Sequence, residues 1–240
     1  MKFPSPLRRG KLIKRYKRFL ADVTLDDGTT VTASCPNTGA MLGLTTPGST
    51  VWLSHSEKAS RKYAHTLEMV EADLGAGPTL VGINTGHPNA IVSAAISSGL
   101  IPEVSGYDSL RREVRYGINS RVDILLESPA KGLCYVEVKN VHLMREPGLA
   151  EFPDSKTERG AKHLAELSNV VAEGHRAVMV YLIQRADAES FSLAGDIDAA
   201  YAEAAAKASA AGVEMLAYRC KLSPQDIVLD ARIPLREPSA

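Results

Sequence analysis

Cysteine, aromatic residues and long apolar runs are all scarce in this sequence of 240 residues. The three cysteines, Cys35, Cys134 and Cys220, lie far apart, which argues against a zinc knuckle, a redox motif or a disulfide framework. Aromatic residues make up only 5% of the chain, so few side chains are available to stack on nucleic-acid bases. No apolar run reaches membrane-spanning length, and prolines and charges interrupt the first 18 residues, where a signal peptide would lie. We therefore expect a soluble, cytoplasmic protein with no membrane partner.

Net charge is also absent, because 28 basic residues balance 28 acidic ones. The basic residues are unevenly distributed, however, since residues 1–18 hold eight of them and no acid. Such a cluster can neutralise the phosphates of a nucleic acid, with an affinity that falls as salt rises. The alternative is a solvated strand face on which the charges only aid solubility. The candidates for phosphate contact in this segment are Arg8, Arg9, Lys11, Lys14 and Arg15.

The first third of the chain has the pattern of short strands separated by turns. A strand over 14–25, the turn Asp26-Asp27-Gly28 and a strand over 29–34 predict a hairpin. Further strands are expected over 50–54 and 63–73. Several short strands at this spacing are typical of a small β-barrel. We assign residues 1–82 to this domain.

The remaining residues, 83–240, alternate helix and strand patterns. Pro88 and Gly99 bracket a helix over 89–98, and Thr157 and Gly174 bracket a second helix over 158–172. This alternation predicts an α/β sandwich with a mixed sheet, so the whole chain is of the α/β or α+β class. Strands are expected over 113–116, 121–126, 133–141, 177–184 and 213–219, with a third helix over 198–211 and a turn at 117–119.

Three charged residues, Asp123, Glu137 and Lys139, lie inside two of these apolar strands. Unpaired charge is very unfavourable in a buried strand, so these side chains must pair with each other or bind a cation. Side chains alternate along a strand, which places Glu137 and Lys139 on one face. If the two strands form a hairpin, Asp123 arrives beside Glu137. The alternative is a set of cross-strand ion pairs of little energetic value.

Two adjacent carboxylates are suited to one hard divalent cation, Mg²⁺ or Mn²⁺. We expect the ligands to be Asp123, Glu137 and the backbone carbonyl of Val138. A cation held in this way keeps several waters and can bind a phosphate, which predicts hydrolysis of a phosphodiester bond. Lys139 is placed to orient or deprotonate the attacking water and to stabilise charge in the transition state.

Four short segments of this sequence together resemble a known family. They are Cys35-Pro36-Asn37-Thr38-Gly39, Ser120-Arg121-Val122-Asp123, Val136-Glu137-Val138-Lys139-Asn140, and Phe152-Pro153-Asp154 with Thr157-Glu158-Arg159-Gly160. The sequence is similar over nearly its whole length to the sugar fermentation stimulation protein family of bacteria and archaea. The resemblance implies an N-terminal barrel of the oligonucleotide-binding (OB) type and a C-terminal domain like the restriction-endonuclease-like nucleases. It also implies DNA binding linked to maltose metabolism.

The nuclease superfamily carries the PD-(D/E)xK pattern, which Asp123, Glu137 and Lys139 match in order. Val122 stands where the superfamily often has proline. The acid that these nucleases carry further upstream has no unique match; Glu103 and Glu113 are the candidates, and we favour Glu113. The resemblance also implies nucleic-acid contacts by Arg121, Glu158, Arg159, Lys162 and His163, although Glu158, Lys162 and Glu166 have the spacing of an ion-paired helix face.

Two functions therefore compete. The first is a metal-dependent nuclease acting on DNA or RNA, which the intact acid, acid and lysine set favours. The second is a non-catalytic DNA-binding regulator linked to sugar metabolism, which uses the barrel and the cleft only for binding. A small-molecule enzyme of sugar metabolism is suggested by the family name alone. A homodimer is an open alternative, since no exposed apolar helix face in the sequence requires one.

Overall fold

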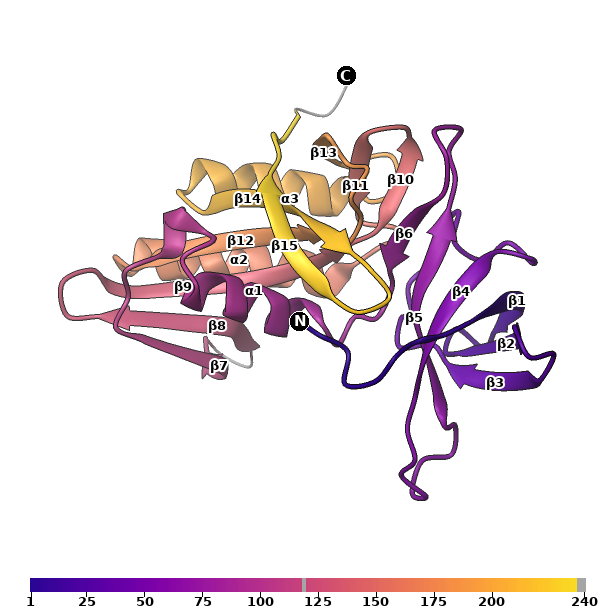
Figure 1. Cartoon of the computed structure of the whole chain (residues 1–240). Helices are drawn as coiled ribbons and strands as arrows, with labels where there is room; N and C mark the ends of the chain where they lie inside the picture. Colours follow the sequence, from indigo (N-terminus) through magenta and orange to yellow (C-terminus); the bar gives the residue numbers. More distant parts are fainter. Residues whose placement is uncertain (118–119, 237–240) are drawn as a thin grey trace.

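The computed structural model describes residues 1–117 and 120–236, which form two domains lying side by side (Figure 1). The N-terminal domain is a small β-barrel, as predicted. Its sheet runs β3-β2-β1-β4-β5-β6, and pairing between β3 and β5 closes it. The strands are β1 (Arg8–Tyr16), β2 (Leu20–Leu25), β3 (Thr30–Ser34), β4 (Thr50–His55), β5 (His65–Ala72) and β6 (Thr79–Gly82).

The start of the barrel differs from the prediction of one strand over 14–25. The chain turns between β1 and β2, so that Tyr16 pairs with Leu20 in a hairpin. Lys17 and Arg18 take left-handed φ angles of 50° and 65° in this turn. Residues other than glycine rarely adopt this conformation, and no glycine, asparagine or proline marks the turn. The sequence pattern therefore gives no sign of the turn and predicts one continuous strand.

The C-terminal domain is the predicted α/β sandwich with a mixed sheet. The order in the sheet is β15-β14-β12-β9-β8-β7, with β14, β12 and β9 parallel and the outer pairs antiparallel. A second, three-stranded sheet has the order β10-β11-β13. The helices are α1 (Pro88–Ser97), α2 (Glu158–Ala172) and α3 (Ala199–Ala210), with a 3₁₀ turn at Pro102–Val104. The strands are β7 (Ser109–Tyr116), β8 (Ser120–Ser128), β9 (Gly132–Val141), β10 (Leu143–Glu146), β11 (Leu149–Phe152), β12 (Arg176–Ile183), β13 (Ser190–Leu193), β14 (Glu214–Leu222) and β15 (Ile227–Arg232).

The large sheet has helices on both faces, and each face has its own core. Helix α1 packs Ile91 and Val92 against one face, together with Val136, Val138 and Val180 of the sheet. Helices α2 and α3 cover the other face, where Met179 and Tyr181 are buried. All three cysteines are buried free thiols. Strands β9 and β12 are therefore buried on both sides, and any charged residue on them lies under a helix or in a cavity.

The ends of the helices follow local capping chemistry. The Thr157 hydroxyl accepts a hydrogen bond from Gly160 N at the start of α2, and Asp198 caps α3 through Tyr201 N. Strands β6, β10, β11, β13 and β15 were missed, because each is only four to six residues long. The turn predicted at 117–119 lies partly outside the described residues.

The first three residues lie on the C-terminal domain rather than on the barrel. Met1 N donates to Ile227 O at 2.6 Å, and Phe3 N donates to Gln225 O at 2.9 Å. The chain then crosses to the barrel (Figure 1). No helix among the described residues is long and apolar enough to cross a membrane.

Candidate active site where two strands diverge

Strands β8 and β9 separate at the predicted site. Their pairing runs from Ser128 opposite Gly132 to Ile124 opposite Val136 and then stops. In place of the next ladder bond, Asp123 Oδ2 accepts a hydrogen bond from Val138 N at 2.8 Å. The N–H and C=O groups of one strand residue point towards the same neighbouring strand. The Val138 carbonyl therefore faces the gap between the strands, beside the Asp123 carboxylate.

Asp123 is also held by helix α1. The Asn89 side-chain amide donates to Asp123 Oδ1 at 2.7 Å and to Glu113 Oε1 at 3.1 Å. Glu113 lies on β7 with a left-handed φ of 55°, a conformation that costs roughly 1–3 kcal/mol for a residue other than glycine. Burial and the negative charge of Glu137 raise the pKa of Asp123. One amide thus holds Asp123 and Glu113, and Asp123 lies within reach of the charge of Glu137.

Glu137 is the most buried member of the set, with 2% of its surface exposed. Its Oε1 accepts from Lys139 Nζ at 2.8 Å and contacts His163 Nδ1. Burial raises the pKa of Glu137, but the hydrogen bond from His163 and the charge of Lys139 outweigh it, so the pKa lies below its usual value. Among the described residues, Oε2 has no hydrogen-bond partner. A buried, ionised oxygen without a partner is unfavourable, and a bound cation would satisfy it.

His163 lies on α2 with only 6% of its surface exposed. Arg159 Nε donates to His163 Nε2 at 3.2 Å, so that ring nitrogen carries the lone pair. The ring proton is then on Nδ1, where it is donated to Glu137. His163 therefore positions the Glu137 carboxylate, and Arg159 fixes the tautomer of the His163 ring. This differs from the phosphate contact expected from the sequence.

These residues line one open cavity of 690 Å³. Of the basic residues predicted to contact nucleic acid, Arg121, Arg159 and Lys162 lie on its wall, and Lys162 also approaches Glu166 at 3.8 Å. Glu158 lies in the first turn of α2 but is not part of the wall. The cavity therefore has carboxylates on its floor and cations around them.

The donor set fits a hard divalent cation. Two carboxylates and one backbone carbonyl leave room for waters and a phosphate, which is the coordination that Mg²⁺ favours. No group of three or more His, Cys, Asp or Glu side chains arranged for a metal occurs within residues 1–117 and 120–236. A closed, all-side-chain site of the zinc type is thus not found in this part of the chain.

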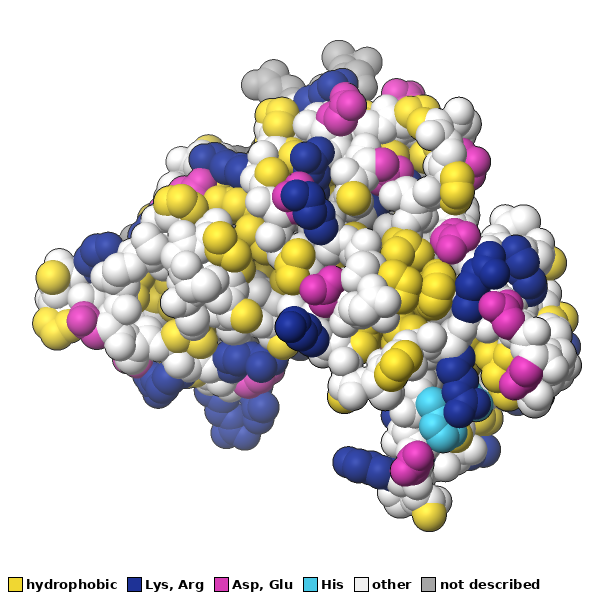
Figure 2. All heavy atoms as spheres, in the orientation of Figure 1, with side chains coloured by type: hydrophobic (Ala, Val, Ile, Leu, Met, Phe, Trp, Pro, Cys, Tyr) yellow, Lys and Arg dark blue, Asp and Glu magenta, His cyan; other side chains and the backbone are white. Residues whose placement is uncertain are grey.

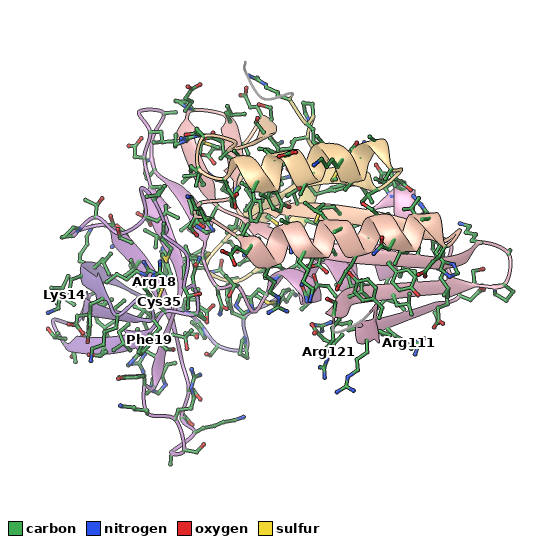
Figure 3. The ribbon with its side chains drawn as sticks, turned by 180° about the vertical axis from the view of Figure 1, so that it is seen from behind. Lys14, Arg18, Phe19, Cys35, Arg111 and Arg121 are labelled. Carbon is green, nitrogen blue, oxygen red and sulfur yellow. The ribbon has the colours of Figure 1, made fainter. Side chains whose placement is uncertain are left out.

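The predicted contacts on β1 lie elsewhere. Arg9 and Lys14 are exposed and pair with Asp26 at 3.6 Å and Asp22 at 3.7 Å. Arg8 and Lys11 are exposed as well. None of these residues lines the cavity, and Lys14 lies at the outer margin of the barrel (Figure 3). Arg15 differs from these residues, because it is half-buried. Its side chain donates to backbone carbonyls near the second domain, such as Gly39 O, as described below.

The structure contains a second group of arginines, of which the sequence analysis had singled out only Arg121. Figure 2 shows basic side chains gathered along the lower edge of the C-terminal domain, beneath β7 and β8. The exposed arginines of these strands are Arg111, Arg112, Arg115 and Arg121. Arg111 pairs with Glu127 at 2.8 Å. The run Arg111-Arg112-Glu113-Val114-Arg115 was a usable signal, because alternate positions of a strand share one face.

Comparison with known proteins agrees with this architecture. Residues 13–83 match the domain described as "SfsA N-terminal OB domain", and residues 86–226 match the "Sugar fermentation stimulation protein RE domain". The chain belongs to the sugar fermentation stimulation protein family. The resemblance seen in the sequence is therefore confirmed, and the barrel is of the OB type.

Relatives in this family match over the full length of the chain. The sugar fermentation stimulation protein homologs of Brucella ovis and Brucella canis are each 57% identical over 237 residues, covering 99% of this chain and 98% of theirs. The structure of Pyrococcus furiosus SfsA in complex with Ca²⁺ is similar with a TM-score of 0.86 and 28% identity, covering 98% of both chains. Both domains of the fold are thus shared with a solved member of the family.

Proposed function

We propose that this chain is a divalent-metal-dependent nuclease that hydrolyses phosphodiester bonds in nucleic acid. The observation that carries the proposal is the gap between β8 and β9. There Asp123, the Val138 carbonyl and the partnerless Glu137 Oε2 are close together, with Lys139 hydrogen-bonded to Glu137. The OB domain supports a nucleic-acid substrate. The Ca²⁺ complex of the Pyrococcus furiosus protein supports a hard cation.

Each residue of the cavity has a role in this proposal. Asp123, Glu137 and the Val138 carbonyl would hold Mg²⁺ or Mn²⁺, which when bound neutralises the scissile phosphate and acidifies a water. Lys139 orients the water and donates to the oxygen on which negative charge develops. Asn89 holds Asp123 and Glu113 in place. We assign Glu113 as the third acid, since it shares this amide, whereas Glu103 is hydrogen-bonded to Tyr218 instead.

The cations around the cavity supply phosphate contacts on either side of the bond that is cleaved. Arg121 is exposed on β8, and Lys162 is on α2. Arg159 combines two roles, because its Nε holds His163 while the two terminal nitrogens of its guanidinium remain available for a phosphate. DNA and RNA both fit this chemistry. The non-catalytic regulator remains the second candidate, and the experiment below separates the two.

The test uses labelled single- and double-stranded DNA and RNA, with Mg²⁺, with Mn²⁺ and with a chelator. We expect metal-dependent cleavage that is lost in Lys139→Ala and kept in Lys207→Ala, which removes an exposed lysine of α3. Asp123→Ala is expected to lose both cleavage and metal binding while nucleic-acid affinity stays nearly intact. Salt-sensitive binding with no cleavage under any condition would establish the regulator, and unchanged cleavage by Asp123→Ala would remove its proposed role.

A further inference from the structure

A second cavity, of 520 Å³, lies between the barrel and the C-terminal domain. Its walls come from the barrel on one side and from the segment between β11 and α2 on the other. It shares Thr85, Asn140 and Thr157 with the cavity of the candidate active site, so the two form one continuous groove. The other residues of its wall are Arg18, Asn37, Thr38, Gly39, His142, Phe152, Pro153, Asp154, Ser155 and Lys156.

Arg15 builds the barrel side of this second cavity. One of its guanidinium nitrogens donates to the carbonyls of Arg18, Asn37 and Gly39, each at 2.8 Å. These bonds draw the β1–β2 turn and the loop after β3 together. The turn would otherwise be unfavourable, because both Lys17 and Arg18 have left-handed φ angles. The Arg18 side chain is thereby held on the wall of the cavity, on the side of the barrel that faces the second domain (Figure 3).

Asp154 fixes the other wall to the barrel. Its Oδ2 accepts from Met41 N of the barrel at 2.8 Å and contacts His142 Nε2 at 3.2 Å. A Cβ on Gly39 would lie 2.7 Å from the same carboxylate, so glycine is needed for this close approach. Thr85 adds a link, since its hydroxyl donates to Pro36 O at 2.7 Å. The groove is therefore a built feature of the contact between the domains.

The chemistry of the groove is that of a site for a polyanion. Beyond the two carboxylates assigned to the metal, its wall carries hydroxyls, amides and more cations than acids. Lys139 and Lys162 are paired with Glu137 and Glu166, whereas Arg18 and Lys156 are exposed. The cations of the whole groove are Arg18, Arg121, Lys139, Lys156, Arg159 and Lys162.

The size of the groove favours a single strand. Each cavity lies within the range of roughly 300–1,000 Å³ that is typical of small-ligand sites. Glu137 lies at the bottom with 2% exposure, so the scissile phosphate must enter the cavity to reach it. A flexible single strand can do this, whereas an intact duplex cannot without deformation. Phe19 does not line either cavity, but it follows Arg18 and is 49% exposed, so it is available for stacking on a base of a strand held there.

We propose that the cavity between the domains binds the single strand that continues from the scissile phosphate, with Arg18 and Lys156 on its phosphates and Phe19 against a base. The direction of this strand relative to the cleaved bond rests on the proposed nuclease function; the binding itself does not. The strand then leaves the active site along the Arg18 side of the barrel, and not across the outward face of β1.

The test measures binding by fluorescence anisotropy with Ca²⁺ in place of Mg²⁺, using a 12-nucleotide single strand, a 4-nucleotide strand and a 12-base-pair duplex. The variant is Arg18→Gly with Lys156→Ala, because glycine keeps the left-handed φ that alanine would strain. We expect roughly tenfold or greater loss of affinity for the 12-nucleotide strand, and a salt dependence that is shallower by about 1.4 in log K against log salt. Duplex binding by the unmodified protein should be weaker than single-strand binding.

Matched variants decide between the two faces of the barrel. Arg8→Ala with Lys14→Ala removes two exposed cations from β1, and we expect little change in affinity. A loss through this pair that equals or exceeds the loss through Arg18 and Lys156 would overturn the proposal, as would duplex preferred over single strand. Lys156→Ala alone should give part of the effect without touching the turn. If the protein cleaves nucleic acid and neither cleavage nor binding depends on Arg18 and Lys156, the proposed strand path is wrong and the proposed nuclease function stands. If single-strand binding depends on these two residues but no cleavage occurs, the strand path stands and the nuclease function is wrong.

Discussion

A buried carboxylate has to be held in one rotamer before it can serve as a ligand, and in the proposed metal site His163 would hold Glu137 in this way. The imidazole donates to Glu137 from one ring nitrogen and accepts from Arg159 at the other. Mutation of a residue that hydrogen-bonds to a metal ligand typically lowers metal affinity or activity by roughly 10–100-fold. In the proposed site His163 is thus a positioning residue, whereas the sequence predicted a phosphate contact.

We predict that His163→Gln lowers Mn²⁺ affinity and kcat by roughly 10–100-fold while leaving KM for the nucleic acid within about threefold. Isothermal titration with Mn²⁺ and steady-state kinetics measure both effects. Glu203→Gln, at an exposed position of α3 that lines neither cavity, is the control. A variant that binds Mn²⁺ normally but loses substrate affinity would instead support the phosphate-contact assignment.

The clustering of three charged residues in the cavity could be predicted at the level of single residues, because buried strands seldom contain charges. Asp123, Glu137 and Lys139 needed only the alternation of a strand and one hairpin to be placed together. Asn89 could not be found in this way. It belongs to a helix, and its contacts with Asp123 and Glu113 depend on how that helix packs across the sheet.

At the scale of the elements, α2 is the piece that brings Arg159, Lys162 and His163 to the cavity. Its first turn is fixed by the Thr157 hydroxyl, which accepts from Gly160 N at 3.2 Å, and by Asp198, which accepts from Thr157 N at 2.7 Å. The side-chain caps of Thr157 and Asp198 are local, so the starts of α2 and α3 could be read from the sequence, whereas the Asp198–Thr157 contact joins residues 41 positions apart and could not.

We predict that Thr157→Ala destabilises the protein by about 1 kcal/mol, because the helix loses its capping acceptor. For a chain of this size the melting temperature should fall by about 2–4 °C. Thr157→Ser keeps the hydroxyl and should stay close to the unmodified protein. Differential scanning calorimetry compares the three; equal melting temperatures for the alanine and serine variants would show that the cap contributes little.

The strands that the sequence did not predict form for a different physical reason. Strand β13 pairs with β11 in parallel, across a long connection that contains α2 and β12. Strand β15 completes the large sheet only by pairing with β14. Such short strands are specified by their neighbours rather than by their own periodicity, so a single sequence carries little sign of them.

At the scale of the whole molecule, the groove between the domains depends on contacts between residues far apart in the chain. Asp154 and Met41 are separated by 113 positions, and no pattern in the sequence pairs them. The basic segment at residues 1–18 was visible, but the members that lie at the groove are Arg15 and Arg18, whereas the exposed charges of β1 lie away from it. Which of these side chains face the groove depends on the conformation of the β1–β2 turn, and the sequence pattern does not show that conformation.

The Asp154 link gives the stability of the molecule a defined pH dependence. Burial raises the pKa of Asp154, but the hydrogen bond and charge of His142 and the bond from Met41 N outweigh it, lowering the pKa to about 2. A carboxyl whose pKa is lower in the folded state stabilises it above the unfolded pKa near 4, and this contribution is lost as the pH falls through the folded value.

We therefore predict that the protein is more stable than Asp154→Asn by about 2 kcal/mol above pH 5, and that roughly half of this difference is lost at pH 3. Urea unfolding at pH 7, 5, 4 and 3 measures it. Asp26→Asn, at an exposed turn of the barrel, should show no comparable trend. A difference that stays constant down to pH 3 would contradict the assignment of the low pKa to this carboxyl.

The hydrogen bonds of Met1 and Phe3 with residues 225–227 set an order of events during synthesis. The barrel is complete once its last strand, β6, has left the ribosome, but the backbone hydrogen bonds of Met1 and Phe3 cannot form until the β14–β15 turn has been made. From the end of β6 to the start of β15, at 5–20 residues per second, this wait lasts roughly 7–30 s. During that interval residues 1–3 lack these hydrogen bonds, and formation of the β14–β15 turn is what supplies them.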